Sequence, residues 1–388
     1  MQRVYLDNNA TTPVLPEVFE AMRPYFGDQF GNASSIHHHG QNTRAAVENA
    51  RESVAALLGC AGSEIVFTSG GTESDNLAIA GLVKSGDHVI TSGVEHHAVL
   101  HAVRHLEEIG CEITVLPVDE QCLIDPQDVK RALRPNTKLV TIMMANNETG
   151  VLQPVEEIGK VAAQAGILFH TDAVQAAGKV AIDVKRIGCQ ALSISGHKFH
   201  GPQGIGALYV KKGTPLLPLF HGGRHERSRR AGTENVPGIV GLGKAAKIAK
   251  YGLDNGAREK LAAMRDGLER RVLEQIEETH VNGAGAPRVP NTTNIRFRHI
   301  EGEALVIALD LKGLAVSTGA ACSSGAIEPS HVLIAMGLRP DQARASIRFS
   351  LGKQTTETEI DFALSLIPST VSRLRDLSPK YDKKAVTT

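Results

Sequence analysis

The chain has 388 residues, of which 42% are hydrophobic and 22% are charged, which is enough apolar side chain for a large globular core. Its 42 basic and 42 acidic residues cancel to a formal net charge of zero, and only 4% of the residues are aromatic, with no Trp. This composition argues against a generally basic nucleic-acid binder with base-stacking surfaces, and against a disordered chain.

The N-terminal sequence MQRVYLDNNATTP contains no apolar stretch of signal-peptide length, and no later run approaches the ~20 apolar residues of a membrane span. The five cysteines are odd in number and widely spaced, so they fit a reducing compartment better than a disulfide framework. We therefore expect a soluble, cytoplasmic protein that binds neither membrane nor nucleic acid directly.

Three consecutive histidines, residues 37–39, lie inside the chain, where they cannot be a terminal expression tag. One interpretation of this triplet is a metal site. The interpretation that we favour is a solvated loop with one functional histidine.

From about residue 64 to residue 210, short apolar runs rich in β-branched residues alternate with helix-like stretches. Near-continuous apolarity is typical of strands that are buried on both faces of a mostly parallel sheet, so this region indicates α/β architecture. The helix-like stretches 74–86, 98–110 and 155–166 each end in a Gly placed as a helix C-cap. The expected strands are residues 64–68, 88–92, 113–118, 139–144, 167–172, 191–195 and 207–210.

After about residue 235 the pattern changes to long helices followed by isolated strands, which indicates a smaller α+β domain. We expect a large domain over residues 14–250, and a small domain that combines residues 1–13 with 251–388. The elements expected in this part are helices within 236–277, near 302–311 and at 356–375, and strands at 291–300, 314–319 and 345–352.

The segment TSGGTESDN, residues 68–76, follows an expected strand and opens a helix. It matches neither a P-loop nor a Rossmann motif. Gly70 and Gly71 would still let backbone N–H groups approach a phosphate at the helix N-terminus, and Thr72 could add a hydroxyl. Taken alone, the segment is more typical of an ordinary helix after a turn.

Two further positions complete a pattern. Asp172 ends an expected strand, at the edge where α/β proteins bind ligands, although an acid there can also cap a helix. Lys198 lies in a turn rich in Gly and His, where a desolvated amine becomes a nucleophile, although a surface lysine is the alternative. A phosphate seat, a carboxylate for a pyridine nitrogen and a lysine for a Schiff base are what pyridoxal 5′-phosphate needs. Together they predict an enzyme that uses this cofactor.

Cys322 lies in the segment LAVSTGAACSSGAIEPSHV, residues 314–332, among small residues with little apolar bulk. A structural cysteine is usually buried among aliphatic side chains, so Cys322 is a candidate nucleophile on a mobile loop. The other four cysteines, at positions 60, 111, 122 and 189, flank helices, strands and turns, and we interpret them as structural.

Motifs along nearly the whole chain resemble those of the cysteine desulfurases of the NifS/IscS type, which are fold-type I enzymes dependent on pyridoxal 5′-phosphate. The resemblance implies that fold: a large domain with a mostly parallel sheet and a smaller C-terminal α+β domain. The matching motifs, in chain order, are YLDNNATTP, FGNASSIH, FTSGGTESDNLAI, EHHAV, ANNETG, HTDAVQAAGK, SGHKFHGPQGIGALYV, HGGRHERSRRAGTEN, STGAACSSGAIEPSHVL and SIRFSLG.

The resemblance also implies roles for individual positions. Lys198 would form the Schiff base and remove the α-proton, His96 would stack on the cofactor ring and help to move protons, and Cys322 would accept the sulfur. Thr233 would reach a phosphate in the other subunit of a homodimer. The residues implied to hold the cofactor are Gly71, Thr72, His96, Asn147, Asp172, Gln175, Ser195, His197, Lys198 and Thr233, and those implied to bind substrate are Asn32, Asn147 and Arg348.

Within the implied cofactor site, Asp172 would pair with the pyridine nitrogen, and Gln175 would hydrogen-bond the phenolic oxygen. The phosphate would be held by the side chains of Thr72, Ser195 and His197 together with the backbone of residue 71. Arg348 would bind the substrate carboxylate through a bidentate pair, with assistance from residue 32.

The implied activity converts L-cysteine to L-alanine and leaves the sulfur on Cys322 as a persulfide, for delivery to iron–sulfur cluster assembly or another acceptor. The implied partners are L-cysteine, a second copy of the chain and a scaffold protein of the IscU/NifU type. We expect no intrinsic metal site, although Cys322 could transiently ligate an iron–sulfur cluster.

Two alternatives stay open at this point. A selenocysteine lyase or another β-lyase with the same cofactor would share the fold, but it would have no need of Cys322. A non-catalytic sulfur-delivery protein would have no need of Lys198, Asp172 and His96.

Overall fold

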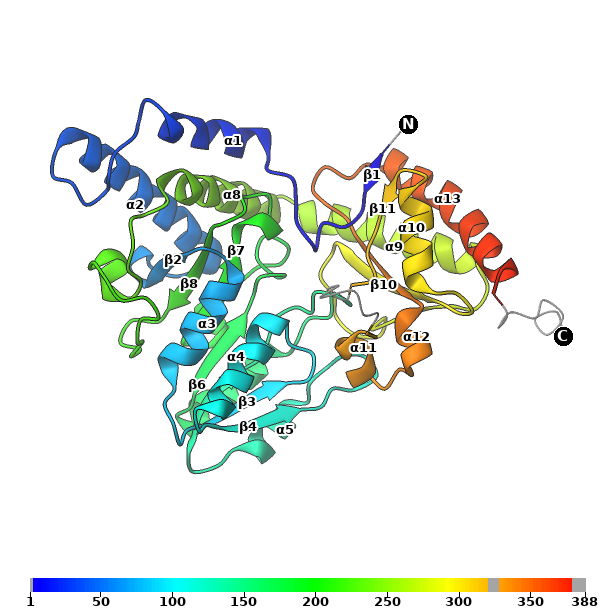
Figure 1. Ribbon diagram of the computed structural model, residues 1–388, viewed down its shortest axis with the longest axis horizontal. Coiled ribbons are helices and arrows are strands. Elements are labelled where there is room, and N and C mark those ends of the chain that lie inside the picture. The colour runs from blue at the N-terminus through cyan, green and yellow to red at the C-terminus, as the bar shows by residue number, and fades with distance from the viewer. Residues whose placement is uncertain (1–2, 320–327, 379–388) are drawn as a thin grey trace.

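A sheet of seven strands runs through the larger of the two units seen in Figure 1. The computed structural model describes residues 3–319 and 328–378. Only β8 is antiparallel to its neighbours, so the predicted mostly parallel α/β sheet is confirmed. In spatial order the strands are β2 (Ile65–Thr68), β8 (Gly206–Val210), β7 (Ala191–Ser195), β6 (Leu168–Asp172), β5 (Thr137–Thr141), β3 (His88–Ser92) and β4 (Glu112–Leu116).

Helices cover both faces of this sheet. Val89 packs with α3 and α4 on one face, and its neighbour Ile90 packs with α2, α6 and α8 on the other, because successive strand residues point to opposite faces. This two-sided burial explains the continuous apolar runs in the sequence. The α-helices of this unit are α1 (Pro16–Met22), α2 (His38–Leu58), α3 (Gly71–Leu82), α4 (His97–Glu108), α5 (Pro126–Ala132), α6 (Val155–Ala165), α7 (Val184–Ile187) and α8 (Val236–Asp254), and the 3₁₀ turns are η1 (Arg23–Phe26), η2 (Gly62–Glu64), η3 (Gly196–Lys198) and η4 (His225–Ser228).

The smaller unit has its own core, built on an antiparallel sheet of three strands. Strand β1, at the start of the chain, pairs in parallel with β11, so the N-terminus belongs spatially with the C-terminal half (Figure 1). The expected boundary at residue 250 falls inside α8, and the exact division into domains stays a prediction. The elements are β1 (Val4–Tyr5), α9 (Ala257–Gln275), β9 (Thr279–Val281), β10 (Thr292–Phe297), α10 (Gly302–Asp310), β11 (Leu314–Ala315), α11 (His331–Ala335), α12 (Pro340–Arg344), β12 (Ser346–Ser350) and α13 (Glu357–Asp376).

Several local expectations were wrong. The histidine triplet is not a loop: His37 caps α2 by accepting a hydrogen bond from the N–H of Gly40, and the next two histidines lie in the first turn. Of the three expected glycine C-caps, only Gly166 takes the left-handed conformation at the cap itself. Helix α3 instead ends at residue 82, well before Gly86, and α4 ends with Ile109 as its cap.

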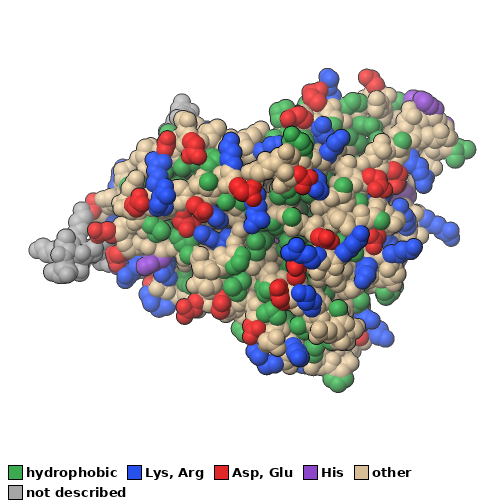
Figure 2. Space-filling model, turned by 180° about the vertical axis from the view of Figure 1, so that it is seen from behind, with side chains coloured by type: hydrophobic (Ala, Val, Ile, Leu, Met, Phe, Trp, Pro, Cys, Tyr) green, Lys and Arg blue, Asp and Glu red, His purple; other side chains and the backbone are tan. Residues whose placement is uncertain are grey.

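The surface mixes both signs of charge. On the face shown in Figure 2, basic and acidic side chains are interspersed with apolar ones. None of the helices within residues 3–319 and 328–378 is long and apolar enough to cross a membrane.

Two helical glycines give a test of the packing. A Cβ atom at Gly159 in α6 would lie 1.9 Å from the carbonyl oxygen of Ile187, whereas a Cβ at Gly267 in α9 would meet nothing within 4 Å. We expect Gly159→Ala to destabilise the protein by about 1–3 kcal/mol through overpacking. Gly267→Ala should stabilise it by up to about 1 kcal/mol, because alanine is the better helix former. Urea denaturation of both variants checks the opposite signs, and equal effects would contradict this account of the packing.

Candidate active site

A cavity of about 410 Å³ opens at the carboxyl ends of the parallel strands, with residues of both units in its wall. Ligands of α/β proteins bind at this edge of the sheet. The structure brings most of the site residues predicted from sequence together around this one cavity. They are Gly71, Thr72, His96, Asn147, Asp172, Gln175, Ser195, His197, Lys198 and Arg348.

Three predicted site residues are not placed there. Asn32 is exposed, and its side-chain oxygen accepts a hydrogen bond from the N–H of Ser34 at 2.9 Å. Thr233 is also exposed and does not line the cavity. Cys322 lies outside the described residues, although Gly319, close before it in the chain, does line the cavity.

Lys198 is the last residue of η3, in the connection that leads from the carboxyl end of β7 to β8. Its Nζ donates to the backbone carbonyls of Asn9 at 2.7 Å and Ala10 at 2.9 Å. Burial, assisted by the charge of Arg348, lowers its pKa from the usual 10.5 to about 8. A substantial fraction of the amine is therefore neutral near physiological pH, and the neutral amine is the nucleophilic form.

Asp172 is the last residue of β6 and is fully enclosed. Its Oδ1 accepts a hydrogen bond from the N–H of Val174 at 2.8 Å, which fixes the carboxyl group at the strand end. Burial nevertheless raises its pKa to about 6. The neighbouring Asp75 also has a raised pKa, through burial and the charge of Asp172. A cationic ring nitrogen in the cavity would give Asp172 a positive partner in addition to Lys198, whose charge also favours the ionised carboxylate.

The N-terminus of α3 forms an anion seat. Its N-cap, Gly70, has no side chain, so the first N–H groups of the helix have no side-chain acceptor. A Cβ at Gly71 would lie 2.7 Å from Val174 Cγ2, so a larger residue there would require the Val174 side chain to shift. The hydroxyl groups of Thr72 and Ser195 line the same end of the cavity. The seat, the buried acid and the neutral lysine together fit pyridoxal 5′-phosphate, which carries a phosphate, a ring nitrogen and an aldehyde.

His96 is both a helix cap and a cavity residue. Its Nδ1 accepts a hydrogen bond from the N–H of Ala98 at 3.1 Å at the start of α4. Burial lowers its pKa to about 4, so the ring is neutral at physiological pH. Because Nδ1 is the acceptor, the proton of the neutral ring lies on Nε2, which is therefore a hydrogen-bond donor.

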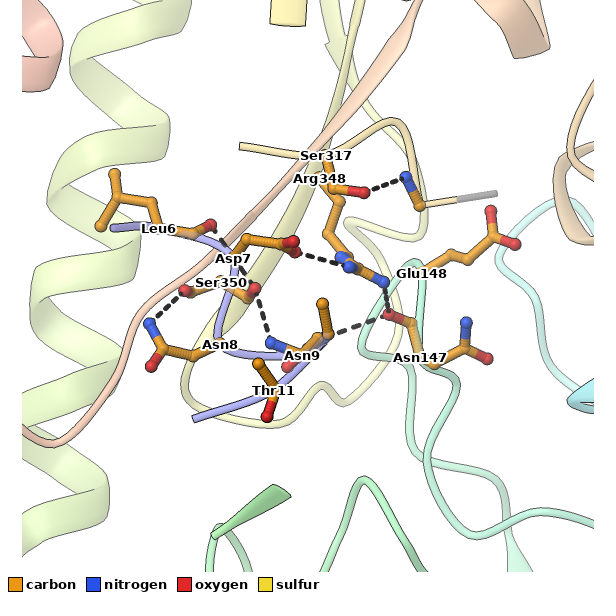
Figure 3. Close-up of polar contacts among 12 residues, drawn as sticks. Leu6, Asp7, Asn8, Asn9, Thr11, Asn147, Glu148, Ser317, Arg348 and Ser350 are labelled. Atoms are coloured by element: carbon orange, nitrogen blue, oxygen red, sulfur yellow. Dashed lines mark hydrogen bonds and ion pairs between the residues drawn. The ribbon is translucent and has the colours of Figure 1, made fainter. Parts of the chain in front are cut away.

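Arg348, in the middle of β12, is shown between two fixed partners in Figure 3. Its Nη2 donates to Asp7 Oδ1 at 2.7 Å, and its Nη1 donates to the carbonyl oxygen of Asn147 at 2.9 Å. Its Nε is buried and has no acceptor among the described residues. The guanidinium group is thus positioned in the cavity wall, and it keeps donor capacity for an anionic ligand.

Sequence reasoning missed several cavity residues that lie inside the motifs it used. Glu148 follows Asn147 directly, accepts a 2.5 Å hydrogen bond from Ser330, and has a pKa raised by burial to about 7. His331 also lines the cavity and bonds to the backbone carbonyl of Glu95 at 2.9 Å. The only signal for these side chains was their adjacency to predicted site residues.

Metal coordination finds no support in the described part of the chain. No group of three or more His, Cys, Asp or Glu side chains within residues 3–319 and 328–378 is arranged to hold a metal ion.

Comparison with known proteins identifies relatives over the whole length. Residues 4–362 match the family described as aminotransferase class-V. The chain is 49% identical to the cysteine desulfurase IscS of Dictyoglomus turgidum, across 99% of this chain and all of that protein. It is 52% identical to a cysteine desulfurase of Trichormus azollae, across 99% of this chain and 97% of the relative.

Solved structures resemble the fold as well. A NifS-like protein superposes with a TM-score of 0.89 at 37% identity, covering 96% of this chain and all of the other. The protein SspA, solved in complex with cysteine, superposes with a TM-score of 0.80 at 39% identity, covering 91% of this chain and 99% of the other.

The lowered pKa of Lys198 predicts unusual amine reactivity. In cofactor-free protein, we expect trinitrobenzenesulfonate to label Lys198 with a rate that reaches half its maximum near pH 8, because the neutral amine reacts. Peptide mapping by mass spectrometry over a pH series measures that profile. A short lysine peptide, which titrates near ~10.4, is the control, and a Lys198 profile that overlays it would contradict the desolvated amine.

Proposed function

The chain belongs to the class-V aminotransferase family and, within it, to the cysteine desulfurases, and on that premise we propose how its own residues take sulfur from L-cysteine. The family is one of pyridoxal 5′-phosphate enzymes. In our proposal the reaction yields L-alanine and leaves a persulfide on Cys322. The single observation that carries the assignment of roles is the cavity in which Lys198, Asp172 and Arg348 meet.

The residues of the cavity suit both pyridoxal 5′-phosphate and L-cysteine. We assign the phosphate to the N-terminus of α3 with Thr72, Ser195 and His197, and the ring nitrogen to Asp172. When bound, pyridoxal 5′-phosphate supplies an aldehyde carbon that amines attack and a ring that takes up the electron pair left at the substrate Cα. Arg348 holds the substrate carboxylate, which presents the α-amino group and the thiol to the centre of the cavity.

The protonation states of Lys198 and His96 indicate which protons these two side chains can accept or donate. Lys198 has an amine that is readily neutral, so once it is free it accepts the proton from the substrate Cα. His96 is neutral and carries its proton on Nε2, so it can donate to a group of the substrate and later recover a proton. Asn147 and Gln175 provide further hydrogen bonds at the cavity wall.

The sulfur step uses Cys322 as the nucleophile. Its thiolate sulfur forms a bond to the substrate sulfur, the Cβ–S bond breaks, and the electron pair stays with the carbon fragment, which is protonated to alanine. The substrate sulfur remains on Cys322 as a persulfide, and an external thiol or an acceptor protein then removes it. A β-lyase would release sulfide without a protein persulfide.

We further propose that the protein acts as a homodimer in the cytoplasm and passes sulfur to a scaffold protein of the IscU/NifU type. Phe26, Phe30 and Ile36 are exposed beside Asn32, which supports the burial of this segment against a second copy. Thr233 is also exposed, so in the proposed homodimer it could reach the cavity of the second copy. Four cysteines of the described residues are free thiols, which suits a reducing compartment.

A persulfide on Cys322 is the decisive product. Brief exposure of the purified protein to L-cysteine without reductant should add one sulfur to Cys322, reversibly with thiol, and release alanine. Intact-mass measurement followed by peptide mapping checks this. Cys322→Ser should lose the adduct, whereas the matched variant Cys60→Ser, at a half-buried cysteine outside the cavity, should keep it. Alanine release with no sulfur on Cys322 would indicate a lyase instead.

Arg348 gives a test of substrate binding. Arg348→Gln should raise the KM for cysteine about 100-fold with a smaller effect on kcat, because a charge-assisted bidentate pair contributes about 2–3 kcal/mol. Asp7 would also lose its partner, so thermal unfolding of the variant is measured in parallel. Arg373→Gln, at an exposed position on α13, is the matched control. An unchanged KM in a folded Arg348→Gln variant would remove this arginine from the substrate site.

A further inference from the structure

One buried lysine has no part in the mechanism described above. Lys179 lies four residues after Gln175 in the turn that follows β6, and its side chain is only 8% exposed. Its Nζ donates to Gln175 Oε1 at 2.6 Å and to Asn9 Oδ1 at 2.9 Å. Both acceptors are neutral amide oxygens, and lysine is seldom buried without an acidic partner. A residue that is so costly to bury calls for a specific reason.

The lysine fixes one end of the Gln175 amide, and the backbone fixes the other. Gln175 Nε2 donates to the carbonyl oxygen of Asn9 at 2.9 Å, while its Oε1 accepts from Lys179. A flipped amide would place Oε1 against the Asn9 carbonyl oxygen, which is also an acceptor. The second N–H of Nε2 is not used by either contact. Because Gln175 lines the cavity, that N–H is the group it has left to offer a ligand.

The charges around Lys179 agree with this arrangement. Burial, with the nearby charges of Lys198 and Arg348, lowers the pKa of Lys179 well below its usual value. A neutral amine has two N–H groups, and the two amide oxygens accept both. The site therefore offers acceptors for two N–H groups of the amine, while burial disfavours its charged form.

We propose that Lys179 is a positioning residue that keeps the Gln175 amide turned so that Nε2 is a permanent hydrogen-bond donor to the phenolic oxygen of pyridoxal 5′-phosphate. The proposal rests on the proposed function, because it takes that cofactor as the ligand of the cavity. Without Lys179, Gln175 Oε1 would be buried without a donor, and the side chain would turn toward another one such as Lys198. A donor to the phenolic oxygen stabilises its anionic form, so loss of the donor changes how the bound cofactor titrates.

The test compares Lys179→Met with Gln175→Glu in the cofactor-loaded protein. Gln175→Glu still offers Lys179 an acceptor, but a carboxylate has no N–H to donate. We expect each variant to raise the pH midpoint of the cofactor's visible absorbance change by about one pH unit, and to weaken retention of pyridoxal 5′-phosphate about tenfold. The double variant should shift no further than either single variant, because both changes remove the same hydrogen bond.

Lys160→Met, at an exposed position on α6, is the matched control and should titrate as the wild type does. Thermal unfolding of the cofactor-free proteins shows how much of each effect is lost stability, which by itself does not move the absorbance midpoint. Should Lys179→Met not fold, Lys179→Gln takes its place. Its amide can accept as well as donate, so Gln175 is no longer held in one orientation and the same rise is expected.

Two results would overturn the proposal. One is a wild-type midpoint in a folded Lys179 variant, and the other is a double-variant shift equal to the sum of the single shifts, which would mean that the lysine acts independently of Gln175. The titration uses bound cofactor and no cysteine, so loss of desulfurase activity would leave it readable. A wild-type protein that bound no pyridoxal 5′-phosphate would instead overturn the proposed function.

Discussion

The whole site depends on the way Asn9 is held. Each polar atom of this residue forms a hydrogen bond: its carbonyl accepts from Lys198 and Gln175 of the large unit, and its N–H and side-chain amide donate to Ser350 and Thr292 of the small unit. The contact with Ser350 is drawn in Figure 3. A single residue of the N-terminal segment thus links the two cores at the point where the cavity forms. Because these bonds reach into both units, they favour one mutual placement, in which all the polar atoms of Asn9 are paired.

Burial then gives the cavity its chemistry. Removal from water lowers the pKa of Lys198 and His96 and raises that of Asp172. In each case burial favours the uncharged form of the side chain. The free-energy cost of burying these ionisable groups is offset when a ligand with the opposite charge binds beside them. The pKa values of Lys198 and Asp172 are in this way moved toward neutral pH, where both groups can exchange protons.

The sequence was most informative where one physical cause dominates. Apolar runs predicted the strands of the large sheet, because burial on both faces favours apolar side chains along most of each strand. The motifs predicted most of the cavity wall. What they did not reveal depended on contacts between distant segments: the role of Asn9 and the burial of Lys179 come from tertiary packing.

Helix α2 begins with a histidine triplet and Gly40, which are weak helix formers, and its long apolar face outweighs them. Asn32 and Thr233 face solvent in the single chain and lie outside the lining of the cavity.

The pairing of the first residues with the last strand also has a consequence for the order of assembly during synthesis. Asn9 and its partner Ser350 are separated by 341 positions, and β1 reaches β11 across almost as much chain. A nascent chain can close the seven-stranded sheet while its N-terminal segment still lacks its partners in the small unit, because contacts of long sequence separation form late. The N-terminal segment that carries the carbonyls bound by Lys198 therefore gains its bond to Ser350 only after the C-terminal strand has been synthesised. The wall of the cavity is thus completed late in synthesis, because Arg348 lies on the same C-terminal strand as Ser350.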